Sequence, residues 1–129
     1  MRIFLDDIRF PADCRLYLNE KAYLDPQWII VRNFEEFVSL IEKELDNIEL
    51  ISFDHDLGTE HYRDAYSTET PYDEYEEKTG YHCAKFLVEF CMDNQKRLPS
   101  FLVHSMNPVG KRNIVSLLTN FKNFQENGN

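Results

Sequence analysis

Short apolar blocks separated by polar stretches predict four strands in this chain. The blocks are brief and rich in β-branched and aromatic residues, which is typical of strands in a buried sheet. The first, third and fourth blocks stop abruptly at polar residues, so each delivers polar side chains at its carboxyl end. The four predicted strands are residues 2–5, 28–31, 49–53 and 101–103.

Three longer segments have the periodicity of amphipathic helices. Asn33, with Glu36 three residues later, resembles a capping box, and Thr79 is a good cap for the next helix. Asn107 followed by Pro108 favours the start of a last helix. Apolar residues recur every three to four positions after each cap, as on a helix face that packs against a sheet. These residues are Phe34, Phe37, Val38, Ile41 and Leu45, then Tyr81, Ala84, Val88 and Cys91, then Ile114, Leu117, Leu118 and Phe121.

Strands that alternate with helices predict parallel β-α-β units. Right-handed crossovers place the four strands in the order 2-1-3-4, numbered along the chain. Residues 10–26 have a poor pattern, and Pro11 and Pro26 leave room for one short helix only. One helix follows the fourth strand, so a fifth strand is not expected. We predict a receiver- or flavodoxin-like three-layer α/β sandwich with a short parallel sheet, reduced to four strands.

Length and composition are those of one packed domain. The chain has 129 residues, of which 43% are hydrophobic and 14% aromatic, and disordered chains lack so much apolar area. We expect a single domain over residues 1–129. An acidic insertion at 59–78 carries seven acidic and two basic residues. A loop of this length is either a lid over a functional site or a solvated connection.

Charge and cysteine content exclude several classes of protein. A formal net charge of -9 repels polyanions, so generic binding of nucleic acids is not expected. The three cysteines, Cys14, Cys83 and Cys91, form no CxxC pair, which argues against a disulfide framework and a zinc knuckle. No signal-peptide pattern follows Met1, and no apolar run is long enough to cross a membrane. We expect a cytoplasmic protein without membrane contact.

Carboxylates follow the strands at the edge where ligands of parallel sheets bind. Asp6 and Asp7 follow the first strand, Asp54 the third, and His104 the fourth. In the predicted strand order these ends share one crevice. Convergent carboxylates repel unless a cation lies between them, and oxygen ligands select Mg²⁺, Mn²⁺ or Ca²⁺ rather than zinc. Asp6, Asp7 and Asp54 are the expected ligands, with Mg²⁺ or Mn²⁺ as the cofactor, although any one of them could instead cap a turn.

The stretch 104–113 adds a candidate anion site to the same edge. A helix that begins near Pro108 directs free backbone amides at the crevice, and Gly110 allows close approach of a phosphate. The alternative is an ordinary helix start with two solvated basic residues, and Arg9 could pair with the acids instead of a phosphate. The expected phosphate-binding residues are Arg9, Ser105, Asn107, Gly110, Lys111 and Arg112.

Two histidines stand at strand ends, where an acid or base would be useful. Imidazole titrates near neutrality, so His55 or His104 could exchange a proton with a substrate. The alternative is a hydrogen-bonded structural histidine. This alternative is weaker for His104 than for His55, because Ser105 and Asn107 accompany His104 in the sequence. His61 and His82 have no such neighbours in the sequence. The expected catalytic residues are Asp54, His55, Asp56 and His104.

An ordered set of motifs covers nearly the whole chain. It consists of Leu5-Asp6-Asp7-Ile8-Arg9, Trp28, Phe53-Asp54-His55-Asp56-Leu57-Gly58, Thr79-Gly80-Tyr81 and Val103-His104-Ser105-Met106-Asn107-Pro108-Val109-Gly110. In these motifs the chain resembles the cyclic-phosphate-processing receiver domains of phages and bacterial conflict systems. That family is similar to response-regulator receivers, in which two acids after the first strand and one after the third hold Mg²⁺. The site residues that the resemblance implies are Asp6, Asp7, Asp54, Asp56, His104, Ser105 and Asn107.

Three functions stay open at this point. The resemblance favours a hydrolase that opens a cyclic phosphodiester, with metal assistance, in a bacterial host or a phage-infected cell, where it would act in anti-defence. The substrate would be a cyclic nucleotide, an RNA-end cyclic phosphate or an ADP-ribose cyclic phosphate. The second is a non-catalytic binder that sequesters a cyclic nucleotide signal. The third is a signalling receiver in which Asp54 accepts a phosphoryl group.

Overall fold

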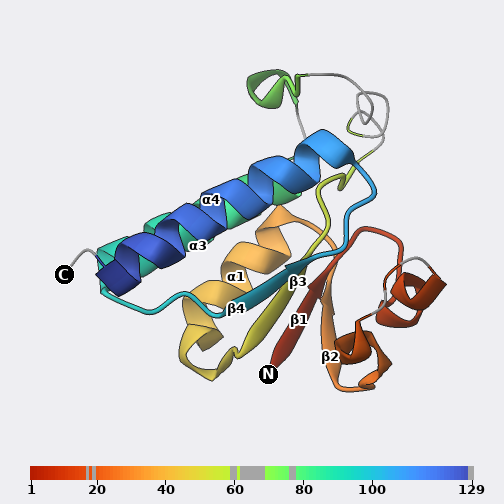
Figure 1. Cartoon of the computed structure of the whole chain (residues 1–129), viewed down its shortest axis with the longest axis horizontal. Coiled ribbons are helices and arrows are strands. Elements are labelled where there is room, and N and C mark those ends of the chain that lie inside the picture. Colours follow the sequence, from red (N-terminus) through yellow and green to blue (C-terminus); the bar gives the residue numbers. More distant parts are fainter. Residues whose placement is uncertain (17, 19, 59–60, 62–68, 76–77, 128–129) are drawn as a thin grey trace.

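A parallel four-stranded sheet forms the centre of the computed structural model (Figure 1). The strands lie in the order β2-β1-β3-β4, which confirms the predicted topology and fold class. Their bounds are β1 (Arg2–Leu5), β2 (Trp28–Val31), β3 (Leu50–Phe53) and β4 (Ser100–Val103). The structure describes residues 1–16, 18, 20–58, 61, 69–75 and 78–127.

All four strands end level with one another at the carboxyl edge. Leu5 pairs with Val31 on one side and with Phe53 on the other, and Phe53 pairs in turn with Val103. The ladder continues one residue further, because the amide of Asp54 donates to Leu5 O at 2.9 Å and that of His104 to Phe53 O at 2.9 Å. The register therefore brings the residues that follow β1, β3 and β4 to the same place.

Three helices begin at the predicted caps. Asn33 accepts from the amide of Glu36 at 2.9 Å, and Thr79 forms a capping box with His82. Asn107 Oδ1 accepts from the amide of Gly110 at 2.9 Å. Each side chain satisfies an amide that has no partner within its helix. The helices are α1 (Phe34–Glu44), α3 (Gly80–Asn94) and α4 (Pro108–Asn127).

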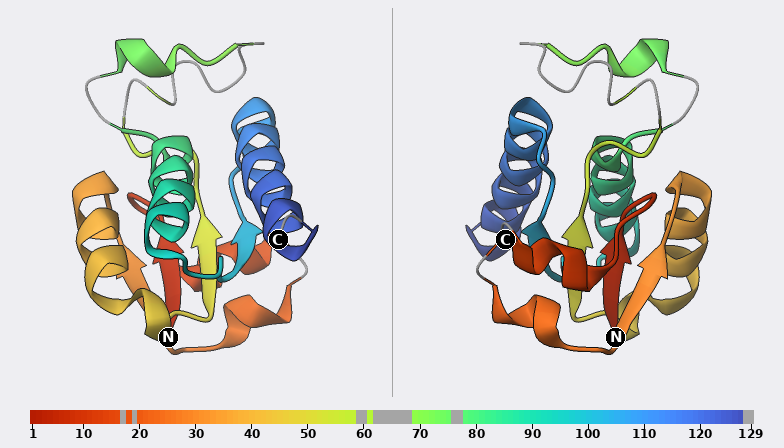
Figure 2. Two further views of the ribbon diagram at one scale, coloured as in Figure 1. Left: turned by 90° about the vertical axis from the view of Figure 1, so that its left-hand side faces the viewer. Right: turned by 90° about the vertical axis from the view of Figure 1, so that its right-hand side faces the viewer.

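The sheet separates two apolar cores of unequal size. On one face α1, α3 and α4 lie side by side (Figure 2) and bury the larger core, to which Ile3, Leu5 and Phe53 contribute from the sheet. The opposite face carries a smaller core around Phe4 and Tyr23. Because strand side chains alternate between faces, Ser52 turns away from its apolar neighbours in β3 toward the smaller core.

The smaller core is covered by the segment for which the pattern predicts one short helix. That prediction is wrong in detail, since the segment forms two 3-10 helices, η1 (Pro11–Leu16) and η2 (Lys21–Leu24). The tighter 3-10 turn suits such short pieces, and the Asp13 carboxylate accepts from the Phe10 amide at 2.8 Å where η1 begins.

The acidic insertion is described only in part. The short helix η4 (Tyr72–Glu74) lies beyond the carboxyl edge of the sheet, near the starts of α3 and α4 (Figures 1 and 2). Most of the remaining insertion, on which the prediction of a lid falls, lies outside the described residues. In the described part of the chain, no helix has the length and apolar character needed to cross a membrane. All three cysteines are buried thiols.

Candidate functional site

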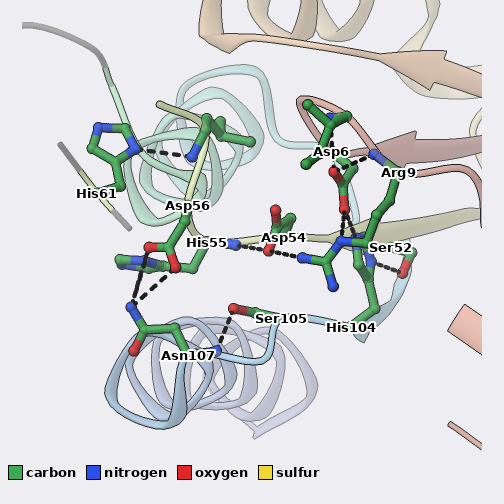
Figure 3. A network of polar contacts seen from close by, with 12 residues as sticks. Asp6, Arg9, Ser52, Asp54, His55, Asp56, His61, His104, Ser105 and Asn107 are labelled. Carbon is green, nitrogen blue, oxygen red and sulfur yellow. Dashed lines mark hydrogen bonds and ion pairs between the residues drawn. The ribbon is translucent and has the colours of Figure 1, made fainter. Parts of the chain in front are cut away.

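Polar side chains gather at the carboxyl edge of the sheet in two adjoining groups (Figure 3). We call the first the carboxylate group and the second the His55 group. The carboxylate group consists of Asp6, Arg9, Ser52, Asp54 and His104. The His55 group consists of His55, Asp56, Tyr72, Asn107 and Asn113.

Asp6 is the fully buried centre of the carboxylate group. Its Oδ2 lies 3.0 Å from His104 Nε2 and 3.0 Å from Arg9 Nε. Its Oδ1 accepts from the amides of Ile8 at 3.0 Å and Arg9 at 2.8 Å. Burial by itself would raise the pKa of Asp6, but the hydrogen bonds from His104 and the Arg9 amide lower this pKa to about 2. Asp6 is therefore an ionised carboxylate whose two oxygens are both occupied.

His104 is held inside the protein by both ring nitrogens. Its Nδ1 lies 2.7 Å from Ser52 Oγ, which lies 2.7 Å from the hydroxyl of Tyr23, and its ring stacks on Phe4 with centroids 4.3 Å apart. Because ionised Asp6 accepts a hydrogen bond from Nε2–H, Nδ1 accepts one from the Ser52 hydroxyl, and Ser52 accepts one from Tyr23. Burial lowers the pKa of His104, and its side chain is 0% exposed. His104 is thus a neutral imidazole in a closed chain of hydrogen bonds.

Arg9 joins the two buried acids of the carboxylate group. Its Nη2 lies 3.3 Å from Asp54 Oδ1, which also accepts from the amide of His55 at 2.9 Å. The second oxygen of Asp54, Oδ2, is buried and has no hydrogen-bond partner within the described part of the chain. Burial, together with the nearby charge of Asp6, raises the pKa of Asp54 well above its ordinary value.

The carboxylate group resembles a metal site in composition but not in its bonding. Asp6, Asp54 and His104 each offer a ligand atom within 4.8 Å of the others, whereas half-buried Asp7 is not part of this cluster. Magnesium requires about six ligands, mostly oxygens. The oxygens of Asp6 and the nitrogens of His104 already have partners, and Arg9 lies between the acids. The residues as arranged do not fit a divalent ion.

The His55 group contains a chain of three hydrogen-bonded side chains. His55 Nδ1 lies 2.8 Å from Asp56 Oδ1, and His55 Nε2 lies 2.8 Å from the hydroxyl of Tyr72. The side-chain amide of Asn113 donates to the same hydroxyl at 3.0 Å. In the tautomer whose Nδ1–H donates to Asp56, Nε2 accepts a hydrogen bond from the Tyr72 hydroxyl. Burial raises the pKa of Tyr72, so its phenol is protonated at neutral pH. This arrangement is an acid-base chain directed from Asp56 to Tyr72.

The start of α4 is built around the His55 ring. Asn107 caps the helix with its oxygen and donates with its nitrogen to Asp56 Oδ1 at 3.1 Å. A Cβ atom at Gly110 would lie 2.3 Å from His55 Cγ, so the glycine makes room for the imidazole. Ser105 Oγ accepts from the amide of Asn107 at 3.1 Å. These three residues, proposed from the sequence to hold a phosphate, therefore bond within the protein.

The remaining candidates lie at the edge of this arrangement. On α4, Lys111 is half-buried and Arg112 is exposed. His61 Nδ1 accepts from the amide of Leu57 at 2.9 Å. His82 Nδ1 accepts from the amide of Thr79 at 2.9 Å, and burial, followed by the charge of Lys78, lowers the pKa of His82 to about 4. Both of these histidines serve the local backbone.

Sequence reasoning missed Ser52, Tyr23, Tyr72 and Asn113. Ser52 gave a signal, since it is a hydroxyl residue between the apolar residues Ile51 and Phe53 of its strand. Tyr72 gave none, because nothing in an acidic insertion indicates that one tyrosine reaches back to a strand end.

A model of the cyclic-phosphate processing receiver domain family matches residues 1–120 of the chain. The chain belongs to this family. No curated protein and no solved structure matches it. The match confirms the resemblance drawn from the sequence motifs, and it places the chain in a family of receiver-like domains involved in the processing of cyclic phosphates.

A cavity of about 390 Å³ adjoins the His55 group of this receiver domain. Tyr72 forms part of its wall and stacks on Tyr81 with ring centroids 4.6 Å apart. His55 is 0% exposed. Among the three hydrogen-bonded residues Asp56, His55 and Tyr72, it is Tyr72 that lines this cavity. The cavity is lined by Thr70, Pro71, Tyr72, Asp73, Glu74, Tyr81, His82 and Lys85.

Proposed function

We propose that this receiver domain is a phosphodiesterase that opens a cyclic phosphate bound in the cavity beside Tyr72. The family description names cyclic phosphates in general, and the candidate substrates are a cyclic nucleotide, an RNA-end cyclic phosphate and an ADP-ribose cyclic phosphate. The observation that carries the proposal is the chain from Asp56 through His55 to Tyr72. A base oriented by a carboxylate and connected to a hydroxyl is the arrangement that hydrolases use to activate a nucleophile.

Tyr72 connects the buried base to the cavity. Its hydroxyl donates to His55 Nε2, so its oxygen can accept a proton from a water molecule in the cavity while its own proton passes to Nε2. The water oxygen attacks phosphorus, and Asp56 stabilises the resulting imidazolium. When the ring P–O bond breaks on the opposite side of phosphorus, the departing oxygen takes a proton from solvent, and the imidazolium releases its proton through Tyr72 to solvent. The product is a phosphomonoester, and the protein returns to its starting protonation state.

Charges on the cavity wall favour the substrate over the product. Lys85 provides one positive charge and Asp73 and Glu74 two negative charges. A cyclic phosphodiester carries one negative charge, whereas a phosphomonoester carries about 1.5 to 2 at neutral pH. Lys85 can balance the former, and the two acids repel the latter. The wall therefore supports release of the opened product.

The alternative is a binder that sequesters a cyclic phosphate without turnover. It is favoured by the complete burial of His55 and His104, neither of which can touch a ligand directly. In this function Tyr72 would only position the cavity wall. The two functions differ in what happens when the Tyr72 hydroxyl is removed.

Phosphorus NMR on a panel of substrates tests the proposal. The protein is incubated with 2′,3′-cyclic and 3′,5′-cyclic nucleotides and with ADP-ribose cyclic phosphates, and acetyl phosphate reports any phosphorylation of Asp54. We expect ring opening, with a loss of roughly 100- to 1,000-fold in kcat for Tyr72→Phe and little change in KM.

Tyr81→Phe is the matched control, because Tyr81 lines the same cavity and stacks on Tyr72. It should retain nearly full turnover. Equal turnover by wild type and Tyr72→Phe would overturn the relay. Stable capture of a ligand without any product would establish the binder instead, and phosphorylation of Asp54 without ring opening would establish a signalling receiver.

A further inference from the structure

The guanidinium of Arg9 lies where the sequence predicts a metal ion. Its Nε is 3.0 Å from Asp6 Oδ2 and its Nη2 is 3.3 Å from Asp54 Oδ1. The two acids are 0% and 1% exposed, so the space between them is shielded from solvent. A cation stabilises ionised Asp6 here, because a buried carboxylate charge is costly unless it is paired.

The loop that carries Arg9 is fixed in place by its own hydrogen bonds. Asp6 Oδ1 accepts from the amides of Ile8 and Arg9. Arg32, from the end of β2, donates to the carbonyls of Asp6 at 3.1 Å and Arg9 at 2.8 Å, and its guanidinium lies over the ring of Phe10 at 4.8 Å. The backbone is thereby held so that the Arg9 side chain, only 19% exposed, enters between the acids.

All but one of the atoms in this group that could bind a metal ion already have a hydrogen-bond or ion-pair partner. Asp6 accepts four hydrogen bonds or ion-pair contacts through its two oxygens, and both nitrogens of His104 have partners. Asp54 Oδ2 alone has none within the described residues. A single oxygen cannot replace the water that Mg²⁺ or Mn²⁺ would lose on entering a buried site.

We propose that Arg9 is the resident cation of the carboxylate group, and that it takes the place of the divalent metal ion predicted from the sequence. The protein therefore binds no Mg²⁺ or Mn²⁺ at Asp6 and Asp54, and the carboxylate group is complete without a cofactor. The inference concerns metal binding alone, so it stands or falls separately from the proposed phosphodiesterase.

Mn²⁺ is the probe, because its bound fraction is measured directly by electron paramagnetic resonance. We expect no site on the wild-type chain with Mn²⁺ in the millimolar range and no change in its melting temperature on adding the ion. Arg9→Ala removes the guanidinium and frees oxygens of both acids. We expect this variant to melt lower by roughly 10 °C without metal, to bind one Mn²⁺, and to recover part of the loss when Mn²⁺ is added.

Three controls locate the effect. Arg2→Ala removes the same side chain from the opposite end of β1, where Arg2 pairs with Asp25, and should gain no Mn²⁺ site. Arg9→Lys keeps a positive charge and should also bind none. The double variant Arg9→Ala with Asp54→Asn should lose the gained site. Two results would overturn the proposal. One is a wild-type protein that binds Mn²⁺ and loses this binding in Asp54→Asn, a test that holds even if Arg9→Ala fails to fold. The other is an Arg9→Ala protein that folds but gains no Mn²⁺ site.

Discussion

The carboxylate group and the His55 group begin at adjacent residues of one strand end and differ in what surrounds them. Asp54 belongs to the first group, whose members come from strand ends, the β1 loop and the interior of β3. His55 belongs to the second, which recruits α4 and the insertion. The first is closed upon itself, whereas the second reaches a cavity through Tyr72.

This difference separates two tasks that the sequence pattern had combined. In the carboxylate group, Arg9 pairs with both Asp6 and Asp54. Such a group fixes the geometry of the strand ends and contributes to stability. The His55 group includes Tyr72, which lines the cavity, and our proposal assigns proton exchange with a ligand to this group. The following changes test that division.

The largest effect is expected for Gly80→Ala, which affects both groups. A Cβ atom at this first residue of α3 would lie 1.7 Å from Asp54 O and 3.0 Å from His55 Cα. Both are backbone atoms of the strand end and cannot move aside as a flexible side chain could. We expect a loss of at least about 3 kcal/mol in the free energy of unfolding, measured by urea denaturation. Wild-type stability would show that the strand end tolerates a shift.

Gly110→Ala should disturb the His55 group alone. The added methyl would meet the imidazole of His55 at 2.3 Å, and the ring would have to leave its position between Asp56 and Tyr72. We expect a loss of about 2 kcal/mol in stability and a loss of turnover of at least about 100-fold, with no gain of Mn²⁺ binding. Full turnover in a folded Gly110→Ala protein would argue against His55 as the base.

Ser52→Ala is the matching test of the carboxylate group. It removes the hydroxyl between Tyr23 and His104, and with it the two buried hydrogen bonds that this hydroxyl makes. We expect a loss of about 2 kcal/mol in the free energy of unfolding, and about 1 kcal/mol for Tyr23→Phe, which removes only the end of the chain. Turnover should stay near that of the wild type. A Ser52→Ala protein that is stable but inactive would contradict the division of tasks.

The smallest effect is a pH dependence from His82, which lies outside the carboxylate group. Its pKa falls from an ordinary 6.5 to about 4 on folding, because burial and then the charge of Lys78 disfavour the protonated ring. The unprotonated Nδ1 accepts from the Thr79 amide. Stability from this cap is present above pH 6.5 and is lost as the pH falls toward 4. Since the ring is only partly buried, we expect about 1 kcal/mol over that window.

His82→Gln tests this directly, because glutamine completes the same capping box without titrating. The difference in unfolding free energy between pH 7 and pH 4 should shrink by about 1 kcal/mol in the variant. An unchanged pH profile would show that His82 does not titrate with folding.

The sequence was sufficient for the sheet and for the meeting of its polar ends. Strand positions follow from apolar blocks, the order from right-handed crossovers, and the helix starts from Asn33, Thr79 and Asn107. These features depend on neighbours within a few residues or on general rules of chain geometry. For the same reason Asp6, Asp54 and His104 could be placed together before any coordinates were known.

Only the tertiary structure decided what these residues bond to once together. The side of the sheet on which His104 lies depends on the stacking partner Phe4 and on Ser52 of the neighbouring strand. Arg9 enters between the acids because Arg32, 23 residues away, fixes the loop. Tyr72 reaches His55 across 17 residues. Side-chain contacts over such separations are set by packing and by competition for hydrogen bonds, and neither is visible in the spacing of residues along a chain.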